Sequence, residues 1–431
     1  MIKNILKPQT LKGFRDFLPT EKRKRDLVAQ KVKEIFELFG YEPLETPTLE
    51  YASLLLGKYG KEADKLLYRF RDSGGREVAL RYDQTVPTAR VLAQYQSALP
   101  KFFKRYQIQN VYRADKPQRG RFREFTQCDI DIFNSTSPIA DAEIVATTYF
   151  AFQNVGYPKI KILINDRQTL FRYLEPFTNS NLNIFSLIQS IDKLEKIGNQ
   201  RVIEELIKKG LDESQAQMAI NSITEATLSK NLAEIIKTTI LLGVPKRDII
   251  FSSSLARGLD YYTGMIFEVV LPGYAAGSCG GGGRYDKLIE QLGGDPTPAV
   301  GIAFGFDRMV EAAEYFKIIS QETRGTQALV TVFDQITLKN SLKLTSELRK
   351  NKIKTEVSPT IEKLDKQLKY ADKKGIQFVV IIGPEEVKKN VLKLKNMKTG
   401  EQKELSESEL IKFLIILIDL IKFQFPNVKI N

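Results

Sequence analysis

A pair of strand-like segments joined by a basic loop is the feature that most constrains the fold of this chain. Lys101 to Arg113 and Arg121 to Phe133 have the short apolar periodicity of strands. The residues between them include Pro117 and Gly120, which favour a loop. The sequence therefore predicts an antiparallel hairpin with a long, basic tip.

The second strand of this hairpin carries different side chains on its two faces. A period of two places Phe122, Thr126, Cys128, Ile130 and Ile132 largely on one face, and Arg121, Arg123, Phe125, Gln127, Asp129 and Asp131 on the other. The hairpin also holds four arginines within eleven residues. These arginines and an aromatic ring suit a triphosphate and a stacked base, although the pattern alone also allows a solvated face with cross-strand ion pairs.

The residue types that the chain lacks restrict its chemistry. Histidine is absent from all 431 residues, which excludes imidazole bases, nucleophiles and metal ligands. Only two cysteines, Cys128 and Cys279, are present, which argues against a disulfide framework and against zinc. No phosphate-binding loop or convincing dinucleotide fingerprint occurs. Nucleotide binding must therefore rest on arginines, and Arg308, after a Gly-rich apolar segment, is a further candidate.

The hydrophobic periodicity changes along the chain, and 431 residues are too many for one ordinary core. Residues 20–39 have helical spacing, which Gly40 ends. Helical periodicity prevails between Asp166 and Arg247, which indicates an inserted helical module. Strand-type patterns return at 264–271 and 299–306, and a helix is expected near Arg284, after a cluster of glycines.

The last quarter of the chain has its own pattern and its own charge. Beyond a polar stretch at 320–326, strands are expected at 328–333, 354–357 and 377–382, alternating with helices at 338–350 and 361–373. This alternation predicts a small, mostly parallel α/β domain, whose last helix begins with a capping box of Ser406 and Glu409. Residues 326–431 contain 20 Lys/Arg and 13 Asp/Glu, so this quarter carries +7 of the net +13. Such a surplus favours a polyanionic partner, and a Lys-rich solvated surface is the alternative.

No segment has the length of unbroken apolar sequence that a membrane span needs, since the nearest, residues 410–423, contains Lys412, Asp419 and Lys422. The first 18 residues contain no apolar signal core. We therefore expect a cytoplasmic protein that does not associate with a membrane.

Several motifs together point to one family. The arginine-rich hairpin and the segment ending in Asp307-Arg308 resemble motifs 2 and 3 of class II aminoacyl-tRNA synthetases. Leu255-Ala-Arg-Gly-Leu-Asp-Tyr-Tyr-Thr-Gly264 and Gly280-Gly-Gly-Gly-Arg-Tyr-Asp286 are similar to the two signature peptides of the histidyl-tRNA synthetase family. Leu11-Lys-Gly-Phe-Arg-Asp16, Tyr41-Glu-Pro-Leu-Glu-Thr-Pro47 (as motif 1) and Ala79-Leu-Arg-Tyr-Asp-Gln-Thr-Val-Pro87 are also similar. The resemblance spans residues 11–405.

The resemblance implies an α+β fold with three parts. A class II catalytic domain with a six-stranded antiparallel sheet would occupy residues 1–165 and 248–320. A helical insertion would occupy 166–247, and an α/β anticodon-binding domain 326–431. The resemblance also implies a homodimer built partly through motif 1 near Pro47. The tip at 116–120 would meet the acceptor end of the tRNA, and the terminal domain its anticodon.

The activity that the resemblance implies is that of a histidine–tRNA ligase. ATP would activate L-histidine to histidyl-adenylate, and transfer to the 3′ end of tRNA(His) would follow, with release of AMP and diphosphate. Mg²⁺ would bind through the ATP phosphates. Because the nucleophile is the substrate's own carboxylate, the reaction needs alignment and charge stabilisation more than a base, which fits a chain without histidine.

Individual roles follow by position within the motifs. Arg113 and Arg257 would be catalytic at the α-phosphate, which both would flank. ATP would be bound by Arg113, Asp115, Arg121, Phe125 and Arg308. Asp115 stands where class II enzymes usually have Glu. Histidine would be bound by Asp83, Thr85, Gln127, Asp131, Tyr261, Tyr262 and Tyr285, with Asp131 reading the imidazole.

Two other interpretations remain open at this point. One is a non-catalytic synthetase paralogue that acts as a histidine-sensing regulatory module, which need not keep Arg257, the nucleotide arginines or a basic terminal domain. The other is a class II synthetase for proline or threonine, against which the peptides around Arg257 and Tyr285 argue. An assay of pyrophosphate exchange into ATP with each of the twenty amino acids separates all three interpretations.

Overall fold

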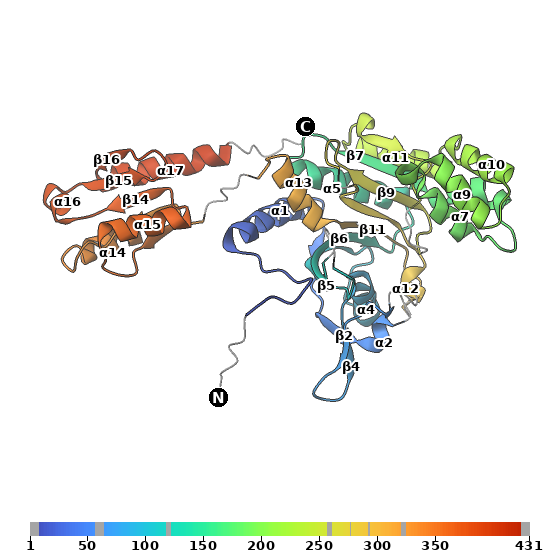
Figure 1. Cartoon of the computed structure of the whole chain (residues 1–431), viewed down its shortest axis with the longest axis horizontal. Coiled ribbons are helices and arrows are strands. Elements are labelled where there is room, and N and C mark those ends of the chain that lie inside the picture. The colour runs from blue at the N-terminus through green and yellow to red at the C-terminus, as the bar shows by residue number, and fades with distance from the viewer. Residues whose placement is uncertain are drawn as a thin grey trace. The chain divides into compact units, whose positions relative to one another are not determined.

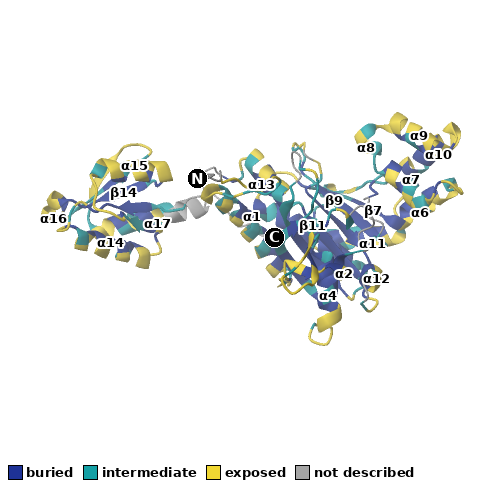
Figure 2. Cartoon of the chain, turned by 60° about the horizontal axis from the view of Figure 1, so that its bottom comes forward, coloured by how far each residue is buried: buried dark blue, intermediate teal, exposed yellow. Residues whose placement is uncertain are grey.

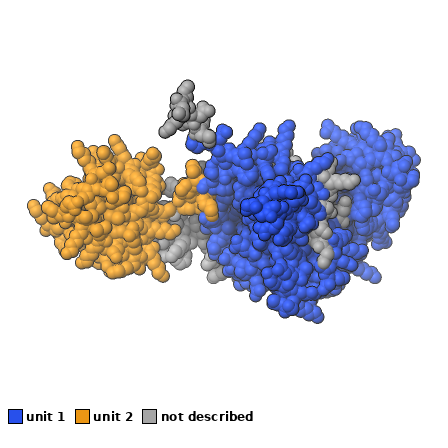
Figure 3. Space-filling view, turned by 90° about the horizontal axis from the view of Figure 1, so that it is seen from below, with its two compact units in different colours: residues 1–17, 25–318 blue, residues 18–24, 319–431 orange. Residues whose placement is uncertain are grey.

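The computed structural model describes residues 8–56, 64–117, 122–256, 261–275, 277–291, 294–319 and 325–423. The chain forms two compact units, one of residues 1–17 and 25–318 and the other of residues 18–24 and 319–431 (Figure 3). Helix α1 (Pro19–Leu38) contributes to both, and Gly40 follows it with a φ of 76°, as the sequence predicts. Each unit has its own sheet and its own core.

The first unit is built on an eight-stranded sheet with the order β1-β5-β6-β11-β10-β9-β7-β8 (Figure 1). The six central strands are antiparallel, as the family resemblance implies. The edge strands β1 and β8 each pair in parallel with their neighbour. The strands are β1 (Glu42–Pro43), β5 (Lys104–Tyr112), β6 (Glu124–Phe133), β7 (Lys161–Asp166), β8 (Ile249–Phe251), β9 (Met265–Val270), β10 (Gly280–Arg284) and β11 (Ala299–Phe304).

The predicted hairpin is confirmed as β5 and β6, which pair from Lys104 with Ile132 to Tyr112 with Glu124. One face of this part of the sheet is apolar. Phe304 on β11 lies opposite Cys128 and packs its ring against those of Phe36 in α1 and Phe152 in α5 (Pro138–Val155). Both cysteines are buried, free thiols. The alternation along β6 therefore turns its polar side chains away from this apolar core.

A second, smaller sheet stands beside the first, with the order β2-β4-β3. Its strands are β2 (Leu49–Tyr51), β3 (Arg69–Arg71) and β4 (Glu77–Leu80), and helix α2 (Ala52–Leu55) packs on it. Helix α4 (Thr85–Tyr95) follows directly and begins at the segment that the sequence singles out for substrate binding. Along the chain, α12 (Leu288–Gln291) precedes the central strand β11, and α13 (Phe306–Tyr315) follows it.

The expected helical module lies between β7 and β8, two neighbouring parallel strands of the large sheet. Its helices are α6 (Arg167–Leu174), α7 (Ile184–Ile191), α8 (Leu194–Ile197), α9 (Asn199–Lys208), α10 (Glu213–Thr224) and α11 (Lys230–Leu241). Figure 2 shows buried strands in the sheet and exposed outer turns in α9 and α10. The core of α6, α7, α9 and α10 is continuous with Leu255, Tyr262 and Tyr285.

The glycine cluster differs from what the sequence predicts. Gly280 to Gly283 form part of the buried strand β10 instead of preceding a helix, and the following helix begins at Leu288 and not near Arg284. A Cβ at Gly282 would overlap the backbone of the neighbouring strand β11. Close packing between strand backbones therefore accounts for glycine at this position, where propensity alone disfavours a strand.

The second unit contains a five-stranded sheet with the order β13-β12-β14-β15-β16. The predicted parallel strands are present, but β15 and β16 were missed and pair antiparallel, so the sheet is mixed. The predicted capping box is confirmed, since the Ser406 and Glu409 side chains each accept from the other's backbone N–H. The elements are β12 (Ala328–Val330), α14 (Leu338–Lys350), β13 (Thr355–Val357), α15 (Leu364–Lys374), β14 (Phe378–Ile381), α16 (Pro384–Lys389), β15 (Leu392–Asn396), β16 (Gln402–Leu405) and α17 (Glu407–Phe423).

Within the part of the chain that the structure describes, no helix combines the length and the hydrophobicity that a membrane span requires.

Candidate active site

A cavity of about 570 Å³ opens over the central strands of the large sheet. Four of the five residues that the sequence predicts for nucleotide binding line it: Arg113, Asp115, Phe125 and Arg308. The fifth, Arg121, lies outside the described residues. Small residues of β10 and β11, and Gly305 directly after β11, also line the cavity: Gly280, Gly281, Ala303 and Gly305. The volume suits a nucleotide-sized ligand.

Arg113 directly follows β5, and its side chain contacts two aromatic rings that line this cavity. Its Nε donates to the Tyr82 carbonyl oxygen at 3.2 Å. Its guanidinium carbon lies 4.3 Å from the ring centroid of Tyr82 and 5.1 Å from that of Phe125. Two cation–π contacts and one hydrogen bond thus restrict the rotamers of a side chain that has a phosphate-binding role by resemblance.

The start of α13 also lines the cavity, through Phe306, Asp307 and Arg308. Arg308 donates from Nη1 to the Ser278 carbonyl oxygen at 2.6 Å. The preceding residue, Asp307, is paired with two arginines from the N-terminal region: Arg15 at 2.8 Å and Arg25. The guanidinium of Arg15 also lies over the ring of Phe122, 3.4 Å from its centroid. Arg308 is therefore held by a backbone carbonyl, while Asp307 ties the start of α13 to the N-terminal region.

A buried polar cluster lies further along β6 and centres on Asp131. Its carboxylate forms an ion pair of 2.5 Å with Arg105 on β5, and accepts a hydrogen bond from the Tyr285 hydroxyl. All three side chains are buried, and Arg105 is 0% exposed. Gly301 lies opposite Asp131 on β11, where any Cβ would overlap the Asp131 carboxylate. The glycine of motif 3 therefore provides the space that this carboxylate occupies.

Burial and neighbouring charges act in opposite directions on these carboxyl groups. Burial raises the pKa of Asp131 above its ordinary value, while the Arg105 guanidinium and the Tyr285 hydroxyl oppose that rise. Burial raises the pKa of Asp129 well above its ordinary value, and one of its carboxylate oxygens accepts no hydrogen bond from the described residues. Two buried carboxyl groups on one strand thus share the positive charge of Arg105.

Tyrosines border this cluster as the resemblance implies. Tyr262 is buried, and its ring centroid lies 4.7 Å from that of Tyr261. The ring of Tyr261 in turn meets that of Tyr285 edge-on at 5.9 Å. The structure thus brings Asp131 and the three tyrosines into one neighbourhood. An aromatic enclosure with one carboxylate suits a flat, polar ring that has an N–H group.

The other predicted histidine-binding residues lie at the start of α4 and beside it. Asp83 accepts from the Val86 backbone N–H at 3.1 Å, and Thr85 is the first residue of the helix. The Gln84 amide donates to the backbone carbonyls of Gln109 and Gln127, at 3.1 and 3.0 Å. These bonds fix the start of α4 against the hairpin. The Gln127 side chain lines the nucleotide cavity, so this residue borders both sides of the site.

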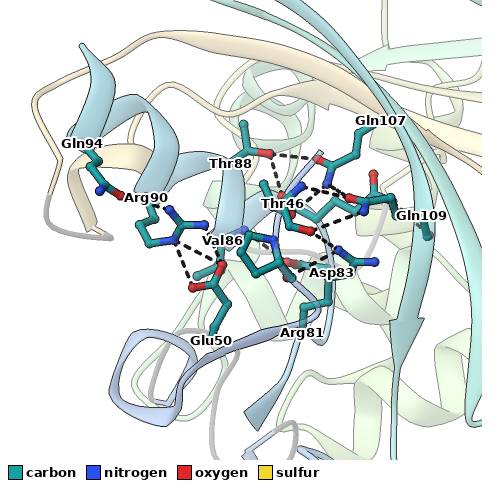
Figure 4. Close-up of polar contacts among 12 residues, drawn as sticks. Thr46, Glu50, Arg81, Asp83, Val86, Thr88, Arg90, Gln94, Gln107 and Gln109 are labelled. Atoms are coloured by element: carbon teal, nitrogen blue, oxygen red, sulfur yellow. Dashed lines mark hydrogen bonds and ion pairs between the residues drawn. The ribbon is translucent and has the colours of Figure 1, made fainter. Parts of the chain in front are cut away.

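Beneath α4 a polar network joins motif 1 to the hairpin (Figure 4). Gln107 donates to the Thr46 hydroxyl at 2.9 Å and to Gln109 at 2.5 Å. Arg81, 2% exposed, donates to the carbonyl oxygens of Thr46 at 2.7 Å and Asn110 at 2.6 Å. Motif 1 is therefore bonded to the same strands that carry the site.

No role followed from the sequence for Arg105, Gln84 or Arg81, although the last two lie in the segment 79–87 that resembles the family. A single arginine or glutamine in a strand or loop gives no signal from spacing or periodicity. Only the pairing of β5 with β6, which sets Arg105 opposite Asp131, reveals its partner. The catalytic candidate Arg257, which the sequence did identify, lies outside the described residues.

The donor set of the site suits a magnesium ion that is bound through phosphates. Among the described residues, no group of three or more Asp, Glu or Cys side chains is arranged to hold a metal ion. The acidic residues Glu268 and Asp115 line the cavity. Mg²⁺ typically binds through one or two carboxylates and the substrate phosphates, so these residues fit that mode.

The architecture and the site together define a class. A six-stranded antiparallel core carries a hairpin with Arg113 and Phe125, and it ends in a glycine-rich strand followed by Arg308. This is the catalytic core of a class II aminoacyl-tRNA synthetase.

Comparisons with known proteins define the family. The histidyl-tRNA synthetase family model matches residues 13–309, and that of an anticodon binding domain matches residues 327–416. The histidine–tRNA ligase of Wolinella succinogenes is 37% identical, over 93% of this chain and 96% of its own length. That of Clostridium tetani is also 37% identical, over 96% of this chain and 99% of its own. The chain therefore belongs to the histidyl-tRNA synthetase family.

Solved structures agree with this membership. The histidyl-tRNA synthetase from Nostoc sp. PCC 7120 has a TM-score of 0.83 and 30% identity, over 95% of this chain and 99% of its own. A Bacillus halodurans structure described as an ATP phosphoribosyltransferase regulatory subunit/histidyl-tRNA synthetase has a TM-score of 0.71 at 22% identity, over 88% of this chain and 99% of its own, which shows the shared fold alone. None of these matches favours the regulatory alternative. The chain is an aminoacyl-tRNA ligase with the function of a histidine–tRNA ligase.

Proposed function

We propose that the two sides of the site divide the reaction of this histidine–tRNA ligase between them. Arg113, Asp115, Phe125 and Arg308, which line one cavity, bind ATP, together with Arg121 from the hairpin tip. Asp131 and the tyrosines 261, 262 and 285 bind the imidazole ring. Asp83, Thr85 and Gln127 bind the α-amino group. The observation that carries this proposal is that Gln127 lines the nucleotide cavity and lies on the same strand face as Asp131.

Adenylation then requires only alignment and charge neutralisation. The histidine carboxylate attacks the α-phosphorus, the new O–P bond forms, and the bond to the diphosphate leaving group breaks. Arg113 is held on the nucleotide side, and Arg257 would approach the same phosphate from the signature peptide. Two guanidiniums aimed at charge that develops in the transition state contribute about 100- to 1,000-fold each. Mg²⁺ would neutralise charge on the phosphate oxygens.

Transfer completes the cycle at the same place. A hydroxyl of the tRNA 3′-terminal ribose attacks the histidyl carbonyl, and AMP leaves. The chain contains no histidine to act as a base, so the phosphate of the departing AMP would accept the hydroxyl proton. The basic hairpin tip and the Lys-rich terminal unit would contact tRNA(His) through its phosphates, which makes binding weaker at high salt.

The same proposal covers the organisation of the chain. A catalytic domain of residues 1–165 and 248–320, an insertion of 166–247 and an anticodon-binding domain of 326–431 would act together in a cytoplasmic homodimer. The helices α6 to α11 between two paired strands support the insertion, and the domain match over 327–416 supports the terminal part. The network that joins Thr46 to the site would let motif 1 link dimer formation to substrate binding.

Pyrophosphate exchange tests the proposal directly. Exchange into ATP is measured with each of the twenty amino acids, and then charging of total tRNA is measured with histidine. We expect exchange to depend on histidine and Mg²⁺. We expect charging to depend on tRNA(His). Exchange with proline or threonine contradicts the assignment of the pocket. Tight histidine binding without exchange would instead indicate the regulatory function.

A further inference from the structure

The junction of β7 and α6, a corner of residues 165–167, is bonded to the segment that leads from β8 into the first signature peptide (residues 255–264). The Asn165 side chain, 0% exposed, donates from Nδ2 to the carbonyl oxygens of Ser253 and Leu255, both at 2.9 Å. These residues lie just beyond the end of β8, where ladder pairing with β7 has stopped. The chain reaches Arg257 two residues after Leu255. One carboxamide therefore fixes the backbone immediately before the catalytic candidate.

The same corner also holds the other end of that peptide. The Arg167 backbone N–H donates to the Gly264 carbonyl oxygen at 3.0 Å. Asn165 itself lies opposite Ile266 in the β7–β9 ladder. Three consecutive residues, 165–167, thus hold both flanks of a peptide that contains Arg257, Tyr261 and Tyr262. The described flanks of this peptide, residues 253–255 and Gly264, are therefore both bonded to one corner of the sheet.

The insertion adds a second attachment from outside. Glu195 in α8 accepts from the hydroxyls of Ser252 and Ser254, at 3.1 and 3.0 Å. These bonds are exposed, so each is worth less than the buried bonds of Asn165. Residues 252–255 are therefore bonded both to Asn165 in the large sheet and to Glu195 in the insertion.

Stability alone does not account for an asparagine at position 165. Its Oδ1 is buried and accepts no hydrogen bond from the described residues, which costs free energy. The β8 strand is already tied to β7 through the ladder and the bond from the Ser252 N–H to the Ile164 carbonyl. What Asn165 adds is the placement of residues past the strand end.

We propose that Asn165 is a positioning residue, which holds residues 253–255 so that the chain enters Arg257 from a fixed point. This inference rests on the proposed function, in which Arg257 acts at the α-phosphate. Asn165 is buried and does not line the nucleotide cavity. Its effect is expected on the rate of adenylation and not on the affinity for histidine, because alignment at the reacting phosphorus is what its loss degrades.

A double-mutant cycle in the pyrophosphate exchange assay tests this proposal. Asn165→Asp keeps the shape of the side chain but replaces two N–H donors with an acceptor, and is expected to lower kcat about 10- to 100-fold. KM for histidine is expected to change less than about twofold. In the Arg257→Ala background, Asn165→Asp is expected to cause no further loss beyond about twofold, because both changes remove one function.

The outcomes separate this proposal from the one on which it rests. Loss by the same factor in both backgrounds overturns the positioning role while leaving Arg257 catalytic. A wild-type kcat for Arg257→Ala overturns both. Should Asn165→Asp fail to fold, Asn165→Ala, which removes both donors without adding a charge, is expected to lower kcat about tenfold, and an unchanged kcat then overturns the proposal. Asn221→Asp, exposed in α10, is the matched control and keeps wild-type kcat.

Discussion

The two sides of the active site are built on opposite principles. On the nucleotide side, Arg113 and Arg308 line an open cavity, where each donates to a backbone carbonyl oxygen and Arg113 also lies over two aromatic rings. On the histidine side, Asp131 is buried and already bonded to Arg105 and Tyr285. Phosphate charge can be met by guanidiniums that need no buried counter-charge. Discrimination between amino acids needs a buried carboxylate whose charge is fixed before the substrate arrives.

The largest expected effect concerns the nucleotide side alone. Arg113→Ala is expected to lower kcat for pyrophosphate exchange about 100- to 1,000-fold, because the variant loses charge stabilisation in the transition state. KM for histidine is expected to stay within about threefold of the wild-type value, since the buried cluster is unaffected. Steady-state kinetics at varied histidine and ATP measure both, with Arg201→Ala on α9 as the exposed control. A large rise in KM for histidine would show that the two sides are not separate.

The next effect concerns the histidine side. Asp131→Asn removes a charged acceptor for the ring N–H and is expected to lower kcat/KM for histidine about 10- to 100-fold. It also leaves Arg105 buried without its ion pair, so thermal stability is expected to fall as well. KM for ATP serves as the internal control and stays near the wild-type value. If KM for ATP rises as much as KM for histidine, the carboxylate does not belong to one side of the site.

A pH profile tests how Asp131 keeps its charge. Burial raises the pKa of this carboxyl group, and Arg105 opposes the rise, so Arg105→Met is expected to raise the pKa further. In the proposed function histidine binds the carboxylate form, which predominates above the pKa. KM for histidine in Arg105→Met is therefore expected to be about tenfold above wild type near pH 6 and to approach it as pH rises.

The charged and titratable groups that influence Asp131 in this profile are Arg105, Tyr285 and Asp83, and it also interacts with Asp129 on the same strand and with Tyr41. Wild-type enzyme over the same pH range corrects for ionisation of the substrate imidazole. Arg105→Lys, which keeps a positive charge, is expected to restore most of the wild-type profile. A profile parallel to wild type at every pH would mean that Arg105 has only a packing role.

The smallest expected effect concerns the stacked base. Phe125→Leu keeps apolar volume but removes the aromatic face, and KM for ATP is expected to rise about 3- to 10-fold. KM for histidine is expected to be unchanged. Initial rates at varied ATP measure the difference. No change in KM for ATP would place the adenine ring elsewhere in the cavity.

The residues of the nucleotide side were easier to predict from the sequence than those that support the histidine side. Arg113, Phe125 and Arg308 lie in motifs with a fixed spacing, so the sequence identified them, and the structure places them around one cavity. Arg105 lies in a strand with no motif of its own, and its role depends on cross-strand register, which sequence periodicity does not give. Side chains that face ligands leave a local pattern, whereas those that hold other side chains are found through tertiary pairing.

The fold shows a similar limit. The hairpin, the helical insertion and the terminal α/β unit were predictable because each has a sustained period of its own. The strand β10 was not, because four glycines favour a turn by propensity and form a strand only through close backbone packing with β11. The hairpin of β15 and β16 was missed as well, because the alternating run of β15 covers only four residues and β16 (Gln402–Leu405) has no apolar alternation.

A crystal structure with histidinol and ATP bound tests the central claim most directly. The division of the site predicts that the imidazole ring lies within hydrogen-bonding distance of the Asp131 carboxylate while Arg105 keeps its ion pair. It also predicts that the triphosphate lies between Arg113 and Arg308, with the adenine ring on Phe125. An imidazole ring bound away from Asp131, or a triphosphate outside this cavity, would contradict it.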